Sequence, residues 1–195
     1  MANKETKAAV SATKVITGKC HASYAHLNEP TKIGDDGKLK YSVSVIIPKS
    51  NTVTLDKIEA AIQAAYEEGE GRLKGNGKTV PALSTLKTPL RDGDAERPDD
   101  PAYENAHFLN ANSDTAPGIV DLARNPILDR NEIYSGMYCR FSIGFYAFNS
   151  NGNRGIACGL NNVQKLADGE PLSGRCSAED DFGDDYVDDD EDFLG

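Results

Sequence analysis

The stretch that decides the fold spans residues 137–160 and reads MYCRFSIGFYAF, then NSNGN, then RGIACGL. A run rich in aromatic residues, followed by Asn, Ser and Gly and by a second apolar run, predicts a strand, a turn and a second strand. Side chains alternate between the two faces of a strand, so the first strand has one wholly apolar face. This face, which we expect to point into the core, consists of Met137, Cys139, Phe141, Ile143, Phe145 and Ala147.

The opposite face of the same strand is too aromatic for a solvent-exposed surface and too polar for a core. It consists of Tyr138, Arg140, Ser142, Gly144, Tyr146 and Phe148. Rings stack on bases, and a guanidinium meets phosphate or stacks itself, so this face suits single-stranded nucleic acid. A sandwich strand whose second face lies under a loop is the alternative, and this strand alone leaves both interpretations open.

The composition bounds the class of protein. A chain of 195 residues is long enough for one domain with a hydrophobic core and tails. No apolar run approaches the ~20 residues that cross a bilayer, and the N-terminus lacks the apolar core of a signal peptide. The cysteines form no C-x-x-C pair, so we expect reduced thiols in a cytosolic compartment, with no disulfide framework, metal site or cofactor. They are Cys20, Cys139, Cys158 and Cys176.

The acidic charge is concentrated at the C-terminus. The formal net charge is −10, and ten of the 31 acidic residues lie from Glu179 onward, where no basic residue occurs. The remaining 21 acidic residues equal the 21 lysines and arginines, so the body of the chain is neutral. Folding does not require this segregation of charge, which therefore predicts a function for the tail. The alternative is a tail that only aids solubility.

Two further strands are expected before the hairpin. The first covers residues 14–24 and is followed by a loop over 28–38 that ends in an Asp-Gly turn. The second covers residues 39–47. Its predicted inward residues are Tyr41, Val43, Val45 and Ile47, and its predicted outward residues are Lys40, Ser42 and Ser44. A short strand is expected over 106–111, after an exposed loop over 88–101 that is rich in Pro, Asp and Arg.

Residues 54–68 carry the one convincing helix pattern. Thr54 is its predicted N-cap, and Gly69 is predicted to end it. Its apolar residues form a single stripe, which predicts packing against a β-core. The stripe consists of Leu55, Ile58, Ile62, Ala65 and Tyr66.

The glycine-rich segment 69–79 reads GEGRLKGNGKT and ends like a phosphate-binding loop. That motif requires a glycine at the position of Arg72, a preceding apolar strand and a following helix, and here Pro81 follows almost at once. We therefore reject nucleotide hydrolysis. The segment is instead predicted to be a flexible loop that closes over a phosphate backbone through Arg72, Lys74 and Lys78.

Five phrases of the sequence, taken in order and together with the acidic tail, resemble a known family. They are YAHLNEP (24–30), KYSVSVIIPK (40–49), PLRDGD (89–94), YSGMYCR (134–140) and GNRGIACGLNNVQKL (152–166). The set resembles phage-encoded single-stranded DNA-binding proteins that pair an OB-type β-barrel with an acidic C-terminal tail. The resemblance covers residues 14–195. Related tails commonly finish on an aromatic residue, whereas here Phe193 is followed by Leu194 and Gly195.

The resemblance implies a mainly β fold, namely a five-stranded OB-type barrel with one packed α-helix, elaborated loops and a disordered acidic tail. The DNA-binding domain is expected over residues 13–174, with a disordered N-terminus over 1–12 and the tail over 175–195. The implied roles are phage DNA replication, recombination and repair in the cytoplasm of the bacterial host, in association with the nucleoid. The implied partners are single-stranded DNA and replication proteins such as a DNA polymerase or a helicase-primase.

The site residues follow from the aromatic strand and the basic segments. We expect Tyr138, Tyr146 and Phe148 to stack on bases without sequence preference. Phosphates are expected to pair with Arg140, Arg154, Lys19, Lys40, Arg72, Lys74 and Lys78. The tail is expected to compete with DNA for this surface and, once displaced, to bind partner proteins. Its predicted contact residues are Phe182, Tyr186, Asp188, Asp189, Asp190, Glu191, Asp192 and Phe193.

Two other classes of function compete with this one. No serine-elbow, metal-helix or paired-carboxylate motif occurs, so we do not expect an enzyme, although a magnesium-dependent nuclease stays open. The other alternative is a protein-interaction or virion structural module whose tail mimics DNA and occupies a partner's nucleic-acid site. The sequence leaves the oligomeric state open, and a homodimer is one of the states it allows.

Overall fold

The computed structural model describes residues 11–34, 37–150 and 152–172. Nearly all of the predicted disordered N-terminus over 1–12, and all of the predicted tail over 175–195, lie outside the described residues. The tail residues Phe182, Tyr186, Asp188, Asp189, Asp190, Glu191, Asp192 and Phe193 are therefore not placed.

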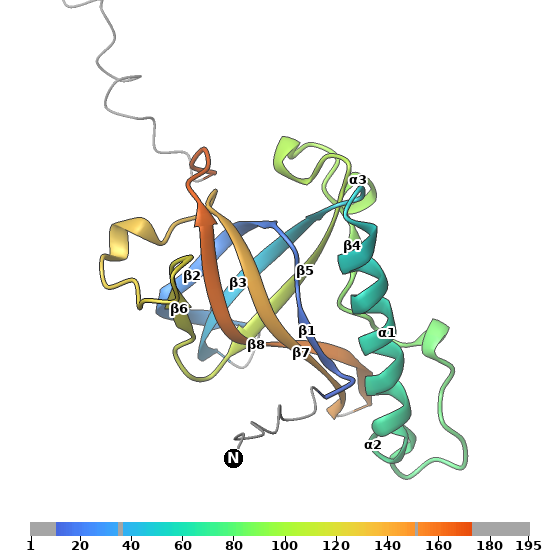
Figure 1. The fold of residues 1–195 in the computed structure, drawn as a ribbon. Helices are drawn as coiled ribbons and strands as arrows, with labels where there is room; N and C mark the ends of the chain where they lie inside the picture. Colours follow the sequence, from blue (N-terminus) through green and yellow to red (C-terminus); the bar gives the residue numbers. More distant parts are fainter. Residues whose placement is uncertain (1–10, 35–36, 151, 173–195) are drawn as a thin grey trace, which may run out of the picture.

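Five strands close into a barrel (Figure 1). They are β2 (Cys20–Ile33), β3 (Lys38–Pro48), β5 (Ala106–Ser113), β8 (Asn153–Ala167) and β7 (Tyr138–Ser150), in the order in which they pair around the ring. The ring closes because β7 pairs with both β8 and β2, and within the ring only the β5–β8 pair is parallel. The predicted mainly β, OB-type barrel is confirmed.

Short elements extend this ring. Three small strands add to its edges: β1 (Lys14–Ile16) on β7, β4 (Arg91–Asp92) on β5, and β6 (Gly118–Val120) on β8. The single-turn helices are η1 (Leu83–Thr85), α3 (Gly93–Glu96), η2 (Pro101–Tyr103) and η3 (Arg130–Glu132). None of the helices among the described residues is long and apolar enough to cross a membrane.

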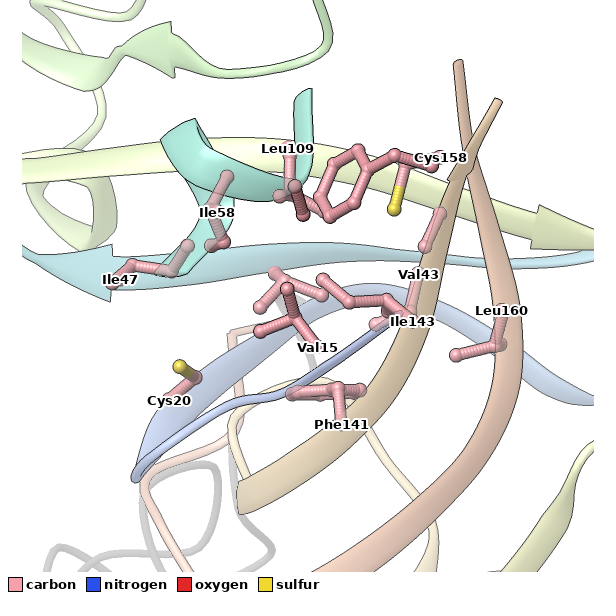
Figure 2. Packing of buried hydrophobic residues seen from close by; sticks show 14 of the residues in the cluster. Val15, Cys20, Val43, Ile47, Ile58, Leu109, Phe141, Ile143, Cys158 and Leu160 are labelled. Atoms are coloured by element: carbon pink, nitrogen blue, oxygen red, sulfur yellow. The ribbon is translucent and has the colours of Figure 1, made fainter. Parts of the chain in front are cut away.

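The barrel interior is filled by the apolar faces of its strands (Figure 2). All six residues of the predicted inward face, five of them in β7 and Met137 just before it, are buried, and none is more than 5% exposed. Phe141 and Ile143 lie in the same cluster as Val43, Leu109 and Leu160 from the other strands. The apolar face read from residues 137–147 therefore lines the core, as predicted.

The main helix, α1 (Thr52–Glu68), lies along one side of the barrel and adds its apolar stripe to the core (Figure 1). Ile58, Ile62 and Ala65 are buried, which confirms the predicted stripe. The predicted N-cap is wrong: the side chain of Asn51 accepts the hydrogen bond from the Thr54 N–H. The Thr54 hydroxyl instead accepts from the Gly18 N–H at 2.9 Å and ties the helix to the N-terminal segment.

The predicted strand over 14–24 and loop over 28–38 are both wrong in their bounds. The first strand breaks at Thr17, whose N–H and hydroxyl both bond the backbone of Phe141 instead of continuing the ladder. The next strand, β2, then runs on to Ile33, past Pro30. Its pairing with β3 shifts register twice, and such bulges accommodate a proline that a regular ladder excludes.

Two other segments predicted as loops contain ordered turns. Residues 69–79 were expected to be a flexible loop, but α2 (Glu70–Lys74) is a short helix anchored by the fully buried Leu73. Residues 88–101 contain β4 and α3, and Gly93 there is buried against Tyr103. Tyr103 and Phe108 form a second small core on the outside of the barrel, so the segment is held in place.

The three cysteines of the described segments are buried and unpaired, in agreement with the expected thiols. Burial raises the pKa of Cys20 to about 11 and that of Cys139 to about 12, so both thiols stay protonated at neutral pH. They act as small core residues and supply no nucleophile. Cys176 lies outside the described residues.

Gly69 is a position where a single methyl group matters. A Cβ there would lie 2.2 Å from the Cβ of Ala147 and 2.9 Å from the carbonyl oxygen of Ala65. We expect Gly69→Ala to lower the free energy of unfolding by about 1–3 kcal/mol through overpacking, measured by urea denaturation. Gly71→Ala is the matched control, because a Cβ at Gly71 meets nothing within 4 Å. An equal loss in both variants would contradict this packing.

Candidate nucleic-acid interface

The predicted DNA-binding residues of β7 separate into two groups at opposite ends of the strand. At the first end, the ring of Tyr138 stacks on His21 with the ring centroids 4.6 Å apart, and the Lys19 ammonium lies 4.4 Å from the Tyr138 centroid. Arg140 is exposed, and its Nε donates to the carbonyl oxygen of Thr17 at 3.1 Å. The Tyr138 ring is thus partly covered by neighbouring side chains, while Arg140 keeps free guanidinium nitrogens for a phosphate.

The second group surrounds the turn between β7 and β8. Tyr146 is 45% exposed, and Phe148 is half-buried beside it. The carbonyl oxygen of Arg72 accepts from the Asn149 side chain at 3.0 Å, which fixes α2 against this turn. A Cβ at Gly75 would lie 3.9 Å from an Arg154 guanidinium nitrogen, so Arg154 approaches the end of the same helix. This end of β7 therefore carries one exposed and one half-buried ring, and Arg72 and Arg154 lie at the adjoining turn.

Other predicted residues are more dispersed. Lys74 is exposed on α2, and Lys78 is exposed beyond it. Lys40 projects from β3 and forms an ion pair with Asp114 at 3.6 Å. Ser44 faces outward as predicted but is covered, because the Tyr103 hydroxyl lies 3.1 Å from its own.

A groove that sequence reasoning missed crosses the outside of β2, β3 and β5. Its volume is about 500 Å³. Its lining includes Tyr24, His26, Lys32, Ser42, Arg97, Asn110 and Asn112. Periodicity did not reveal Tyr24 because it sits on a bulge of β2, and Arg97 lies in a segment that reads as plain loop. The sequence carries no local signal that the two meet.

A single row of paired residues connects the groove with Tyr146. Across the strands the row reads His26, Ser42, Asn112, Gly159, Gly144 and Lys14, each the register partner of the next. The row follows the curved barrel wall for roughly 24 Å, measured along the surface at the usual strand spacing. A Cβ placed on Gly159 would lie 3.6 Å from the Tyr146 ring, so the ring borders this row. The groove and the Tyr146 end therefore belong to one continuous outer surface of small side chains.

The segment that carries Arg97 is tied to the end of β3 by Lys49. The Lys49 ammonium donates to Asp92 at 2.9 Å and to Asp94 at 2.7 Å. These hydrogen bonds hold the pKa of both carboxyls below its ordinary value. Because the folded-state pKa is lowered, the stabilisation is present above the ordinary carboxyl pKa and is lost as the pH falls through the folded values. Both carboxyls are on the surface, so the contribution is small.

A family model matches the whole of the described barrel and shows which family the chain belongs to. The model of the single-stranded DNA-binding protein of Enterobacter phage Enc34 matches residues 13–194 of this chain. The chain belongs to this Enc34 family. The match spans the whole barrel as well as the acidic tail, so the resemblance read from the five sequence phrases is confirmed.

Solved structures of phage single-stranded DNA-binding proteins share the fold. The single-stranded DNA-binding protein from bacteriophage Enc34 in complex with single-stranded DNA is 25% identical, with a TM-score of 0.70 over 83% of this chain and 90% of that one. The single-stranded DNA-binding protein gp2.5 of bacteriophage T7 is 13% identical, with a TM-score of 0.59 over 84% of this chain and 97% of that one, and shows likeness of fold alone. A relative by sequence, protein p50 of Acyrthosiphon pisum secondary endosymbiont phage 1, is 29% identical over 83% of this chain and 87% of its own length.

Proposed function

We propose that this chain binds single-stranded DNA without sequence preference and protects it. One observation carries the proposal: the chain shares its family and its barrel with a phage protein whose structure holds single-stranded DNA. The exposed Tyr146 ring, and the cations Arg72 and Arg154 at the adjoining β7–β8 turn, support the same conclusion from the chain's own residues.

Bases stack on the rings and phosphates pair with the cations in this proposal. Tyr146 and Phe148 offer ring faces at one end of β7. At the other end Tyr138, which stacks on His21, offers the edge of its ring. Arg140, Arg154, Lys19, Lys40, Arg72, Lys74 and Lys78 supply the positive charge. Every base has a π-face, so stacking does not discriminate between sequences, and phosphate pairing does not either.

The test is a fluorescence anisotropy titration with labelled oligo-dT and with duplex DNA, at two salt concentrations. We expect tight binding of oligo-dT, weaker binding of the duplex, and a marked loss of affinity for oligo-dT at the higher salt concentration. If Tyr146→Ala and Arg140→Ala fold normally and bind oligo-dT as the wild type does, then these residues are wrongly assigned. If the wild-type protein does not bind oligo-dT, the proposed binding of single-stranded DNA is wrong.

The acidic tail acts, in this proposal, as an internal competitor. Its ten carboxylates present negative charge along the chain as a string of phosphates does, so they occupy the basic surface when DNA is absent. DNA displaces the tail, and its freed residues then recruit replication proteins such as a polymerase or a helicase-primase. The protein thereby supports phage DNA replication, recombination and repair in the host cytoplasm.

Deleting residues 179–195 is expected to tighten the binding of oligo-dT at low salt, because the competing carboxylates are removed. The gain should shrink as salt rises, since screening weakens the tail and the DNA contacts alike. Anisotropy titrations of the truncated and full chains at two salt concentrations measure it. Exchanging the ten acidic residues for Asn and Gln at full length is the matched control, and it should reproduce the gain. Unchanged or weaker binding by both variants would contradict the competition.

A further inference from the structure

The segment between β6 and η3 turns two leucines out to solvent, on the side of the barrel away from α1 (Figure 1). Leu122 is 66% exposed and Leu128 is 88% exposed, more than any other large apolar side chain of the described residues. Ala123 is also exposed, and Ile127 is half-buried. We name these four residues the leucine patch. Scattered exposed leucines are ordinary, whereas several in one place indicate an interaction surface.

Hydrogen bonds hold the leucine patch in a fixed shape. The Ile127 N–H donates to the Ile119 carbonyl oxygen at 3.0 Å, and the Asn125 N–H donates to the Asp121 carboxylate at 2.9 Å. The Gln164 side chain on β8 donates to the Asp121 carbonyl oxygen at 3.1 Å. A partner therefore does not have to order this segment on binding, which keeps the entropic cost of association low.

A hollow of about 370 Å³ adjoins the leucine patch. Its apolar lining consists of Leu122, Ala123 and Ile127 from the patch and Leu166 and Ala167 from the end of β8. Leu128 follows Ile127 in the chain but is not among the lining residues, and its side chain points into solvent. The patch therefore combines a protruding leucine with a hollow that is larger than a leucine side chain.

Charges of both signs surround the leucine patch. Over residues 121–132 and 165–168 the acidic side chains are Asp121, Asp129, Glu132 and Asp168, and the basic ones are Arg124, Arg130 and Lys165. Two of the cations already form ion pairs, Lys165 with Asp168 at 2.7 Å and Arg130 with Glu29 at 2.8 Å. DNA and the acidic tail are uniformly negative and would meet four carboxylates here. A mixed set of charges is instead complementary to a second copy of itself.

We propose that the leucine patch is the contact surface for a second copy of this chain. In an isologous pair the same patch of each copy faces the other, so the Leu128 side chain of each copy enters the hollow of the other. The patch lies outside the groove lining and outside the row from His26 to Lys14. Both copies of a pair therefore keep their DNA-binding surfaces uncovered.

The pair is expected to be weak. One leucine from each copy and its neighbours form a contact below the size of stable interfaces, which bury about 1,200–2,000 Å². The two acidic tails also repel each other at low salt. We expect a dissociation constant of about 0.1 mM at moderate salt. The chain is therefore monomeric at the micromolar concentrations of a denaturation experiment.

Sedimentation velocity of the full chain without DNA, from about 5 to 500 µM and at about 0.3 M salt, tests the pair. The weight-average mass should rise from that of one 21.0 kDa chain toward twice that value. Leu128→Asp places a carboxylate in a hollow that already contains Asp121, Glu132 and Asp168, and should weaken association at least about 10-fold. Leu128→Ala removes the contact without adding charge and should weaken association as well.

Val53→Asp is the matched control. Val53 is 64% exposed in the first turn of α1, so the substitution adds the same charge at a similar exposure and should associate as the wild type does. Amide spectra of the ¹⁵N-labelled wild type at about 20 and 500 µM locate the contact. The shifts should concentrate on the leucine patch and leave Tyr146 unchanged.

A mass that stays at one chain over the whole range overturns the pair. So does equal association of the wild type and both Leu128 variants, an equal loss in Val53→Asp, or concentration-dependent shifts that avoid the leucine patch. Oligo-dT titrations at nanomolar protein, where every variant is monomeric, test DNA binding separately. There Leu128→Asp should bind as the wild type does.

Discussion

Phe141→Ala is expected to lower the free energy of unfolding by about 3–5 kcal/mol, which is a large share of the stability of a domain of this size. The Phe141 side chain is fully buried at the centre of the core that β7 shares with the other barrel strands (Figure 2). Its backbone is also held by Thr17, because the Thr17 hydroxyl accepts a hydrogen bond from the Phe141 N–H at 2.9 Å. Because the neighbouring strands are fixed by their pairing, the site collapses little and a cavity is left. Urea denaturation of the two proteins measures the difference.

Leu128→Ala is the matched control for this variant. Leu128 is 88% exposed, so its removal should change the free energy of unfolding by no more than about 0.5 kcal/mol. A loss below about 1 kcal/mol for Phe141→Ala would mean that the barrel core is not centred on β7.

Exchanging Arg72, Lys74 and Arg154 for Gln together is expected to change the salt dependence of DNA binding most strongly. These cations meet at the turn between β7 and β8, on elements that the Asn149–Arg72 hydrogen bond holds together. Each phosphate contact on a single strand contributes about 0.7 to the slope of log affinity against log salt, so the slope should fall by about 2. Affinity at low salt should fall with it. Anisotropy titrations with oligo-dT at four or more salt concentrations give the slope.

A charge-matched control separates local contacts from the overall field. Lys57, Arg124 and Arg130 are exposed cations on other elements, and their exchange for Gln removes the same total charge. Their slope should remain close to that of the wild type. Equal slopes for the two triple variants would show that phosphates do not gather at the β7–β8 turn.

The central hairpin was predictable because its pattern is local. Alternation along residues 137–147 gives the core face of β7, and the Asn- and Gly-rich run gives the turn that leads into β8. The apolar stripe of α1 was predictable for the same reason. Its N-cap was not predictable, because Asn51 and Thr54 are both residue types that suit this position. In the structure Asn51 is the cap, and the Thr54 hydroxyl instead accepts a hydrogen bond from Gly18.

The course of β2 and the groove beside it depend on contacts between distant parts of the chain. Pro30 suggests a loop when read locally, whereas the register shifts against β3 allow the strand to continue past it. The same irregularity turns Tyr24 outward. Arg97 reaches Tyr24 because Lys49 fixes Asp92 and Asp94, and because Gly93 packs on Tyr103. No alternation or spacing in the sequence predicts these contacts between distant residues.

The path of the DNA strand across the barrel can be measured directly by titrating ¹⁵N-labelled protein with oligo-dT and following the amide chemical shifts. We predict the largest shifts along one band that includes Tyr24, Ser42, Asn112, Gly159 and Tyr146, with little change at Leu122 and Leu128 beyond β6. Shifts confined to the β6 side of the barrel, with none at Tyr24 or Tyr146, would contradict binding across this outer surface.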